Sequence, residues 1–252
     1  MSFVDTGNYN LANSNYKRFP LDLGTSSNQG HFMTITIFPS GKKSGNVQTV
    51  ALFIPGGGQN GALQWQMAHE YDEVKLSRIG AGVASAIIGI GSDIIPGLNA
   101  AAGGLFRRQI NPGVEVLYRG TELRKFDFSF IFAPQNQEDA DMLYGASQGY
   151  SGDGILNRFR YYAAPETDFA GLLFKSPSEW RIFFYYKNNQ KAWNVNPYLP
   201  KISKCVCTRI DVDINPDSEF STFENGDPVS ARLTMRFVEM EIIDKKLIDK
   251  GF

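Results

Sequence analysis

Four phenylalanines at alternate positions within residues 123–133 constrain this chain more than any other feature. They are Phe126, Phe128, Phe130 and Phe132. Side chains two residues apart point to the same face of a β-strand, so this spacing predicts a strand with one aromatic face. That face needs a second layer of structure to cover it, because burying it is strongly favourable. With 19 Phe and 11 Tyr among 252 residues, the chain has the material for an extensive β-rich core.

Other stretches share the character of strands. The expected strands are 32–38, 47–54, 114–118, 123–133, 180–187, 205–215 and 232–243. The stretch 180–187 is apolar on both faces, so it needs cover on both sides, from its own domain or from a neighbour. The alternation of the last strand slips near Phe237-Val238, which predicts a β-bulge there.

Helical signals interrupt these strands. Asn136 is an expected helix N-cap, because Glu138 and Asp139 follow it and suit the positive end of a helix dipole. A second helical stretch is expected at Ile155–Tyr162. Residues 62–78 place Leu63, Met67, Tyr71 and Val74 at a spacing near 3.6, which predicts a helix. The fold class that follows is mainly β with some α (α+β).

Residues 79–106 are apolar and rich in Gly and Ala, with Asp93 as the one charged residue. A membrane span needs about 18 or more uninterrupted apolar residues, and Asp93 with Pro96-Gly97 divides this stretch into shorter pieces. We therefore expect it to be buried against protein, which argues for a partner. Membrane insertion of 79–106 remains the alternative.

The expected domain organisation has two parts. Residues 1–30 are polar, rich in Asn and without a period, and form an extended N-terminal arm. This arm is either disordered or ordered on a neighbouring subunit. Residues 31–252 form a single domain with a helical and Gly/Ala-rich insertion at about 60–108.

Charge and composition exclude several classes of function. Lys and Arg total 25 against 26 Asp and Glu, so the chain lacks the cationic surplus of a general nucleic-acid binder. Two His and two Cys leave little material for a metal site or a His-based catalytic centre. We expect no catalytic, cofactor-binding or metal-binding residues and no enzymatic activity. An enzyme whose catalytic residues are dispersed along the chain stays open as an alternative.

Two short motifs bear on calcium binding and on disulfide formation. Asp211-x-Asp213-x-Asn215 begins like a calcium loop, but Pro216 stands where such a loop needs Gly and Thr222 stands where it needs Glu. Cys205 and Cys207 lie two residues apart on an expected strand, a geometry that rarely closes a disulfide. We interpret them as reduced packing residues, in keeping with a cytosolic compartment.

Two segments together resemble a known family. Residues 111–134 contain Asn111-Pro112, then Tyr118-Arg119-Gly120, then the Phe-alternating strand and Ala133-Pro134. Residues 205–242 close with Asp227-Pro228-Val229 and the strand Leu233–Ile242. This layout resembles the tail-tube fold of contractile-tail phage baseplates, in the family of tube initiator (tail-tube junction) and tail-tube cap proteins of T4-like phages. The resemblance covers roughly residues 110–243.

The resemblance implies a fold, an assembly and a role. The fold would be a tail-tube-like β-sandwich with a flanking helix, and six copies would form a ring whose strands close into one β-barrel. The ring would join the central baseplate hub to the tail tube and template tube polymerisation, with no enzymatic chemistry. A tube cap or tube subunit of the same fold stays open, as does, from another class, a monomeric β-sandwich binding module.

The resemblance also implies partners and a location. The partners would be further copies of the chain in a homohexamer, the hub protein, and the tail tube or a second tube-initiating ring. Further neighbours would be tape measure, wedge and sheath proteins. DNA would pass through the lumen without sequence-specific contact, no membrane would be involved, and the protein would belong to the virion, assembled in the host cytoplasm.

The expected functional residues are surfaces rather than a reactive centre. The subunit-interface candidates are Phe126, Phe128, Phe130, Trp180, Phe183, Tyr185, Ile87 and Ile88. The lumen-facing candidates are Asp211 and Asp213, where negative charge would repel passing DNA phosphates. An ordinary solvated strand face is the alternative explanation for these two carboxylates.

Overall fold

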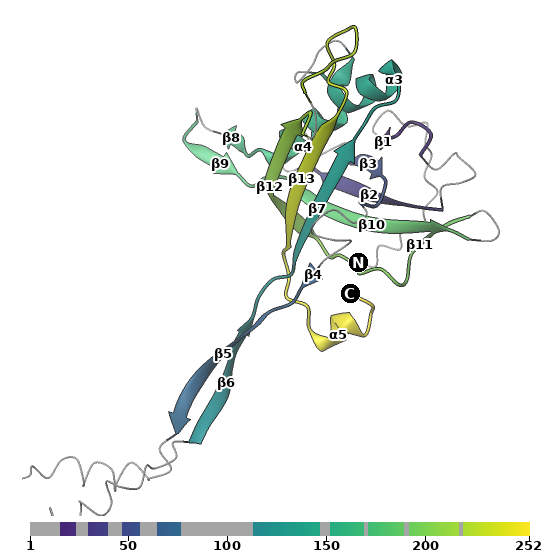
Figure 1. The fold of residues 1–252 in the computed structure, drawn as a ribbon. Coiled ribbons are helices and arrows are strands. Elements are labelled where there is room, and N and C mark those ends of the chain that lie inside the picture. The colour runs from purple at the N-terminus through teal and green to yellow at the C-terminus, as the bar shows by residue number, and fades with distance from the viewer. Residues whose placement is uncertain are drawn as a thin grey trace, which may run out of the picture. The chain divides into compact units, whose positions relative to one another are not determined.

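The protein is mainly β with a few helices and contains a mixed sheet (Figure 1). The computed structural model describes residues 16–23, 30–39, 47–55, 65–76, 113–146, 152–168, 171–188, 192–216 and 219–252. The strands are β1 Tyr16–Phe19, β2 His31–Phe38, β3 Gln48–Leu52, β4 Trp65–Gln66, β5 His69–Leu76, β6 Gly113–Thr121, β7 Lys125–Phe132, β8 Glu166–Asp168, β9 Leu173–Lys175, β10 Glu179–Lys187, β11 Trp193–Val195, β12 Cys205–Ile214 and β13 Ala231–Glu239. The helices are α3 Gln137–Ala140, the π-helix η1 Asp141–Gly145, α4 Ile155–Ala163 and α5 Lys245–Ile248.

Contacts divide the chain into two compact units. The first, here called the sheet unit, comprises Met1–Met67 and Leu123–Phe252, and the second, the ribbon unit, comprises Ala68–Glu122. The sheet unit holds a sheet of order β1-β3-β2-β10-β12-β13-β7-β4, with β11 paired to β10. The ribbon unit holds the antiparallel pair β5–β6.

The large sheet folds over its own core. Figure 1 shows β12, β13 and β7 side by side, crossing the direction of β2 and β10. β10 joins β12 through one residue pair, Trp180 with Cys205, so the sheet turns a corner there. Across the core, the rings of Phe128 and Phe184 lie 6.4 Å apart and those of Trp180 and Phe237 lie 5.6 Å apart. No closed barrel forms within the part of the chain that is described.

The strand with one aromatic face, predicted for residues 123–133, is confirmed. In β7, Phe126, Phe128, Phe130 and Phe132 are buried and the residues between them are exposed. The expected strands at 180–187 and 205–215 are present as β10 and β12. The alternation within 205–215 predicts Ile210, Val212 and Ile214 inside and Asn215 outside. The three apolar residues of β12 do pack against the core, whereas Asn215, directly after the strand, is buried.

The helices after β7 begin as the sequence indicates. The Asn136 side chain accepts a hydrogen bond from the backbone N–H of Asp139 at 2.8 Å, which confirms the expected N-cap. At Gly154, which precedes α4, an added Cβ would lie 2.4 Å from the carbonyl carbon of Tyr144, so only glycine lets these two segments approach. Helix α4 then packs on the sheet, where the Phe159 ring lies 5.9 Å from that of Trp180.

The helix expected over 62–78 is wrong in its described part. Residues 69–76 form strand β5, which pairs antiparallel with β6 over Gly113–Thr121. The apolar spacing near 3.6 was a local signal, and the backbone hydrogen bonds of a partner distant in sequence outweighed it. The ribbon unit, 68–122, also begins and ends later than the insertion expected at about 60–108.

Part of the expected N-terminal arm belongs to the protein's own sheet. β1 pairs parallel with β3, and Lys17 Nζ lies 3.3 Å from an Asp153 carboxylate oxygen. The backbone N–H of Leu21 donates to Asp139 Oδ1 at 3.1 Å. Residues 16–23 are therefore held by their own chain, and the remainder of the arm lies outside the described residues.

The bulge expected near Phe237-Val238 lies on the neighbouring strand. The β12–β13 register shifts between Cys207 and Arg209, directly opposite Phe237 and Arg236. The extra residue is thus Thr208, and β13 itself runs regularly against β7. Cys205 and Cys207 are buried free thiols, as expected of packing residues.

Candidate functional site

Three neighbouring strands, β12, β13 and β7, form the surface that best fits the expected role, and we call them the assembly sheet. Its strands are antiparallel, with β13 in the centre. One face packs into the core and the other carries polar side chains. An assembly surface built from such strands depends on two properties, the hydrogen-bonding state of its edges and the charge of its outer face.

The outer edge of β7 is unpaired along most of its length in the described part of the chain. The backbone N–H of Glu239 donates to the carbonyl of Arg124 at 3.0 Å. Hydrogen-bonded pairs recur at every second residue of an antiparallel ladder, so Phe126, Phe128, Phe130 and Phe132 direct their backbone groups toward β13. Asp127, Ser129 and Ile131 direct theirs outward, and among the described residues β4 pairs only with Lys125 and Phe126.

Most of the outer edge of β12 is likewise unpaired within the ranges that the structure describes. The backbone N–H of Asn215 donates to the carbonyl of Ser230 at 3.0 Å, which places the ladder bonds of β12 at its polar-face residues. Ile210 and Val212 therefore direct their backbone groups away from β13. β10, the next strand in the sheet, pairs with β12 at Cys205 alone within the described ranges.

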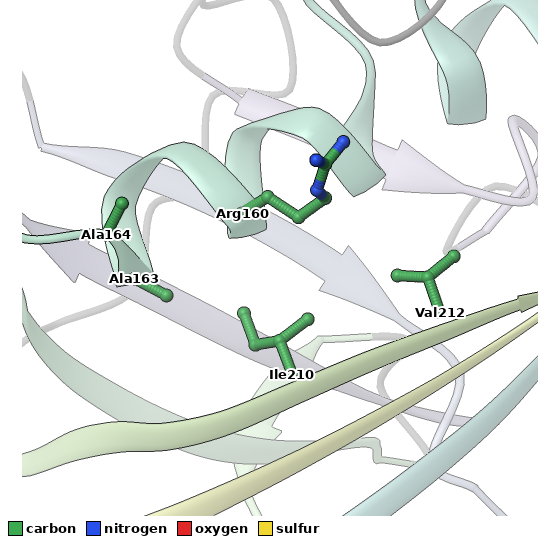
Figure 2. Close-up of a pocket in the computed structure, with 5 residues that line it drawn as sticks. All are labelled: Arg160, Ala163, Ala164, Ile210 and Val212. Atoms are coloured by element: carbon green, nitrogen blue, oxygen red, sulfur yellow. The ribbon is translucent and has the colours of Figure 1, made fainter.

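A hollow of about 630 Å³ borders this β12 edge (Figure 2). It is lined by Ile210 and Val212 of β12 and by Arg160, Ala163 and Ala164 at the end of α4. Figure 2 shows the side chains of Ile210 and Val212 pointing from the strand toward the helix. The hollow combines an apolar floor with one cationic residue, and it offers no acid–base pair for catalysis.

The outer face of the assembly sheet carries Asp211 and Asp213 together with basic residues, so its charge is mixed. That these two carboxylates face a lumen stays a prediction. Arg209 Nε lies 2.5 Å from Asp211 Oδ2, and Arg236 Nε lies 2.7 Å from Asp127 Oδ1. The hydrogen bond and charge of Asp127 raise the pKa of Arg236, with a smaller contribution from Asp211. The charged residues of this face are Lys125, Arg209, Arg232, Arg236, Asp127, Asp211 and Asp213. One pair within β12, Arg209 with Asp211, and one pair between β13 and β7, Arg236 with Asp127, neutralise part of this charge locally.

Most of the expected interface residues lie inside the protein's own core. The exposed fractions are 2% for Phe126 and Phe128, 0% for Phe130 and Trp180, and 3% for Tyr185. Phe126, Phe128, Phe130 and Trp180 face the main core because the corner between β10 and β12 folds one part of the sheet over the other. Tyr185 is buried on the other face of β10, where its ring stacks on that of Phe32 at 5.1 Å. None of the five rings has a surface to offer a second copy. Phe183 is partly buried against a smaller cluster around Phe32, and Ile87 and Ile88 lie outside the described residues.

A buried ion pair was not predicted from the sequence. Arg124 donates from Nε and Nη2 to the Glu239 carboxylate at 2.6 and 2.8 Å, and both side chains are almost fully buried. Glu239 Oε1 also accepts from the backbone N–H of Ser203 at 2.7 Å, while Arg124 Nη2 donates to the carbonyl of Lys201 at 3.0 Å. The network ties the segment before β12 to the beginning of β7. The charged Arg124, just before the alternating phenylalanines, was the sequence signal for this ion pair, but its partner Glu239 lies 115 residues away.

Neither metal ligation nor membrane crossing finds support in the described part of the chain. Its His, Cys, Asp and Glu side chains form no group of three or more that could hold a metal ion. No helix within the same ranges is long and apolar enough to cross a membrane. In comparisons with known proteins, no protein-family model and no curated protein matches the chain.

Proposed function

We propose that this protein is a structural subunit of a contractile phage tail baseplate, in which six copies form a ring that joins the central hub to the tail tube. The ring templates the first layer of the tube, so the protein acts as a tube initiator. The fold, on this proposal, is a tail-tube-like β-sandwich with α4 as the flanking helix. The partners are the hub on one side and the tube, or a second tube-initiating ring, on the other.

The observation that carries the proposal is the pair of open edges on the assembly sheet. Long strands with unpaired edges invite association, and closing them into a barrel removes that liability. β7 offers the backbone groups of Asp127, Ser129 and Ile131, and β12 offers those of Ile210 and Val212. The two edges differ, so the contact is heterologous and generates a ring when the rotation closes.

The strand directions specify the contact further. β12 and β7 both run antiparallel to β13, so they run parallel to each other. Copies related by rotation about an axis along the strands keep these directions, so β7 of one copy meets β12 of the next in parallel. The polar faces then line the lumen. Their paired charges leave little net field there, so passing DNA is neither strongly repelled nor retained.

Native mass spectrometry and negative-stain imaging test the ring. Ser129→Pro removes an N–H that points to the open edge, and proline is tolerated on edge strands. We expect the wild type to form a six-fold ring, alone or with hub and tube proteins, and Ser129→Pro to stay folded but monomeric. Ser129→Thr, which keeps the hydroxyl that lies 3.2 Å from Thr234 Oγ1, is the matched control and should form the ring.

A second edge variant distinguishes loss of ring formation from misfolding. Ile131 is 53% exposed on the outer face, and Ile131→Lys places a charge at the edge without touching the core. It should also prevent ring formation. Wild-type protein that stays monomeric with both partners, or edge variants that form rings normally, would contradict the proposal. Stacking on the tube without the hub would favour a tube cap, and polymerisation alone would favour a tube subunit.

The burial of the candidate aromatic residues favours one alternative, a monomeric β-sandwich binding module. Trp180 and the β7 phenylalanines are covered within one chain, so the sheet unit does not need a neighbour to complete its core. On this alternative the hollow beside β12 receives the ligand. The Ala163→Leu variant would fill the hollow and abolish ligand binding. On this alternative, neither the wild type nor the variant would form a ring.

A further inference from the structure

The ribbon unit presents a sheet that lacks a third strand. β5 and β6 pair with each other, and no other strand joins them within the described residues. A two-stranded ribbon is at best marginally stable in water, and a further strand or a packing partner is what stabilises it. The described base of the ribbon comprises residues 68–72 and 118–122.

An ordered aromatic cluster lies on one face of this base. The rings of Tyr71 and Tyr118 meet edge to face at 5.7 Å, and both residues remain more than half exposed. The hydroxyl of Thr121 lies 2.5 Å from the Tyr118 hydroxyl and 2.9 Å from His69 Nδ1. Thr121 thus holds the Tyr118 ring in place through one hydrogen bond and is itself held by His69 through the other. A pair of fixed, exposed tyrosine rings is a surface on which a cationic group can stack.

Among the described residues, no strand pairs with the outer edge of β5 beside this cluster. The N–H of Glu122 donates to the carbonyl of Ala68 at 2.9 Å, so Ala68 and then Glu70 direct their backbone groups toward β6. His69 and Tyr71 therefore direct theirs to the outer edge. An extended segment that adds along this edge would place alternate side chains on the two faces of the ribbon.

Charge decides which segment fits. The base carries Glu70, Asp72 and Glu122 against Arg119, an excess of acidic over basic residues. Glu70 and Asp72 are exposed, and they lie on the face opposite the tyrosine rings because they alternate with His69 and Tyr71 along β5. A second copy would bring the same acidic excess, whereas a basic segment would meet complementary charge on one face and aromatic rings on the other.

We infer that the β5 edge binds an extended, Arg- or Lys-rich segment of a partner protein by strand addition. Cationic side chains at alternate positions stack on Tyr71 and Tyr118, and those between them pair with Glu70. They also meet Asp72, whose Oδ1 lies 3.5 Å from Arg119 Nη1 in the free ribbon. Thr121 is a positioning residue, because it acts through the Tyr118 ring. The inference is independent of the ring, since it uses residues of the ribbon unit alone.

Fluorescence anisotropy with the full chain tests this inference. The probe is a labelled, end-blocked Arg-Thr repeat peptide, and its comparison is a Glu-Thr peptide of equal length. We expect the Arg-Thr peptide to bind, with an affinity that falls as salt is added, and the Glu-Thr peptide not to bind. The Tyr71→Leu/Tyr118→Leu variant should weaken binding by roughly five- to tenfold.

Two further variants, one control and one positioning variant, show which residues are responsible for the binding. Tyr198, 94% exposed in the sheet unit, is the matched control, and Tyr198→Leu should leave the affinity unchanged. Thr121→Val keeps strand propensity but removes the hydroxyl, so it should weaken binding by roughly two- to threefold and broaden the Tyr118 ring resonances in NMR spectra. Equal binding of both peptides, absence of Arg-Thr binding, or unchanged affinity in the double variant would overturn the inference. Self-association that is lost in the double variant would assign the edge to a second copy and overturn it as well.

Discussion

The sheet unit and the ribbon unit both place aromatic rings side by side on strands, with opposite results. In β7 the Phe rings at alternate positions are 0–2% exposed, whereas in the ribbon Tyr71 and Tyr118 are 55% and 56% exposed. The strands themselves do not differ in kind. The difference lies in the second layer, because the sheet unit folds β2, β3 and β10 over β7, and the ribbon has two strands in its described sheet. Alternation therefore selects a face, and tertiary structure decides whether that face is covered.

Truncating one aromatic ring in each unit tests directly whether covered and exposed rings contribute differently to stability. Phe130→Ala should lower the free energy of unfolding by about 3–5 kcal/mol, because it leaves a cavity in a fully packed core. Tyr118→Ala should change it by about 0.5 kcal/mol or less, because the ring is exposed. Urea denaturation followed by circular dichroism measures both. Equal losses would show that the ribbon tyrosines contribute to a packed core after all.

The buried ion pair allows a second test within the sheet unit. Arg124→Met leaves Glu239 charged and buried, so we expect a loss of about 3 kcal/mol in the free energy of unfolding. The double variant Arg124→Met/Glu239→Met removes both charges and should recover part of that loss. A double variant whose loss equals the sum of the two single losses, in the same denaturation assay, would mean that the pair does not act as a unit.

A smaller effect is expected at the surface pair that holds β1. Burial acts to raise the pKa of Asp153, but the hydrogen bond and charge of Arg158, together with Lys17, outweigh it and lower the pKa. The stabilisation is therefore fully present above the unfolded-state pKa and disappears as the pH falls through the lower folded-state value. Because the Asp153 side chain is 69% exposed, solvent screens the pair and the contribution should be about 1 kcal/mol or less.

The measurement for Asp153 compares wild type with Asp153→Asn over a range of pH. The difference in unfolding free energy should be constant from about pH 7 to pH 5 and should shrink toward about pH 2. A difference that grows on acidification would show that the sign is wrong.

The smallest effect concerns reactivity rather than stability. Burial raises the pKa of Cys207 to about 11 and that of Cys205 further still. Since the thiolate is the nucleophile, neither cysteine should be alkylated by iodoacetamide at about pH 8 in the folded protein. Both should react in urea, and mass spectrometry distinguishes the two states. Rapid alkylation of the folded chain would place the β12 core face in contact with solvent.

The local alternation of residue types was sufficient to predict most of the sheet unit. The Phe spacing of β7, the two apolar faces of β10 and the N-cap at Asn136 each describe a physical requirement that neighbours in sequence can express. The helix expected over 62–78 failed because a spacing near 3.6 and a strand pairing compete, and the pairing partner of β5 begins at Gly113. Five of the interface candidates are covered within their own chain, because residue type alone does not say which layer covers a ring. The assignment of the other three stays a prediction.

The amino-acid order therefore established which residues alternate, where helices α3 and α4 begin, and which side chains are apolar or charged. Folding alone decided that the corner at Trp180 and Cys205 turns the sheet over its own aromatic rings, that Arg124 meets Glu239, and that the backbone groups of Ser129 and Val212 face outward. The physical reason is that periodicity is a property of a few adjacent residues, whereas burial, ion pairing and open edges depend on which distant segments come together.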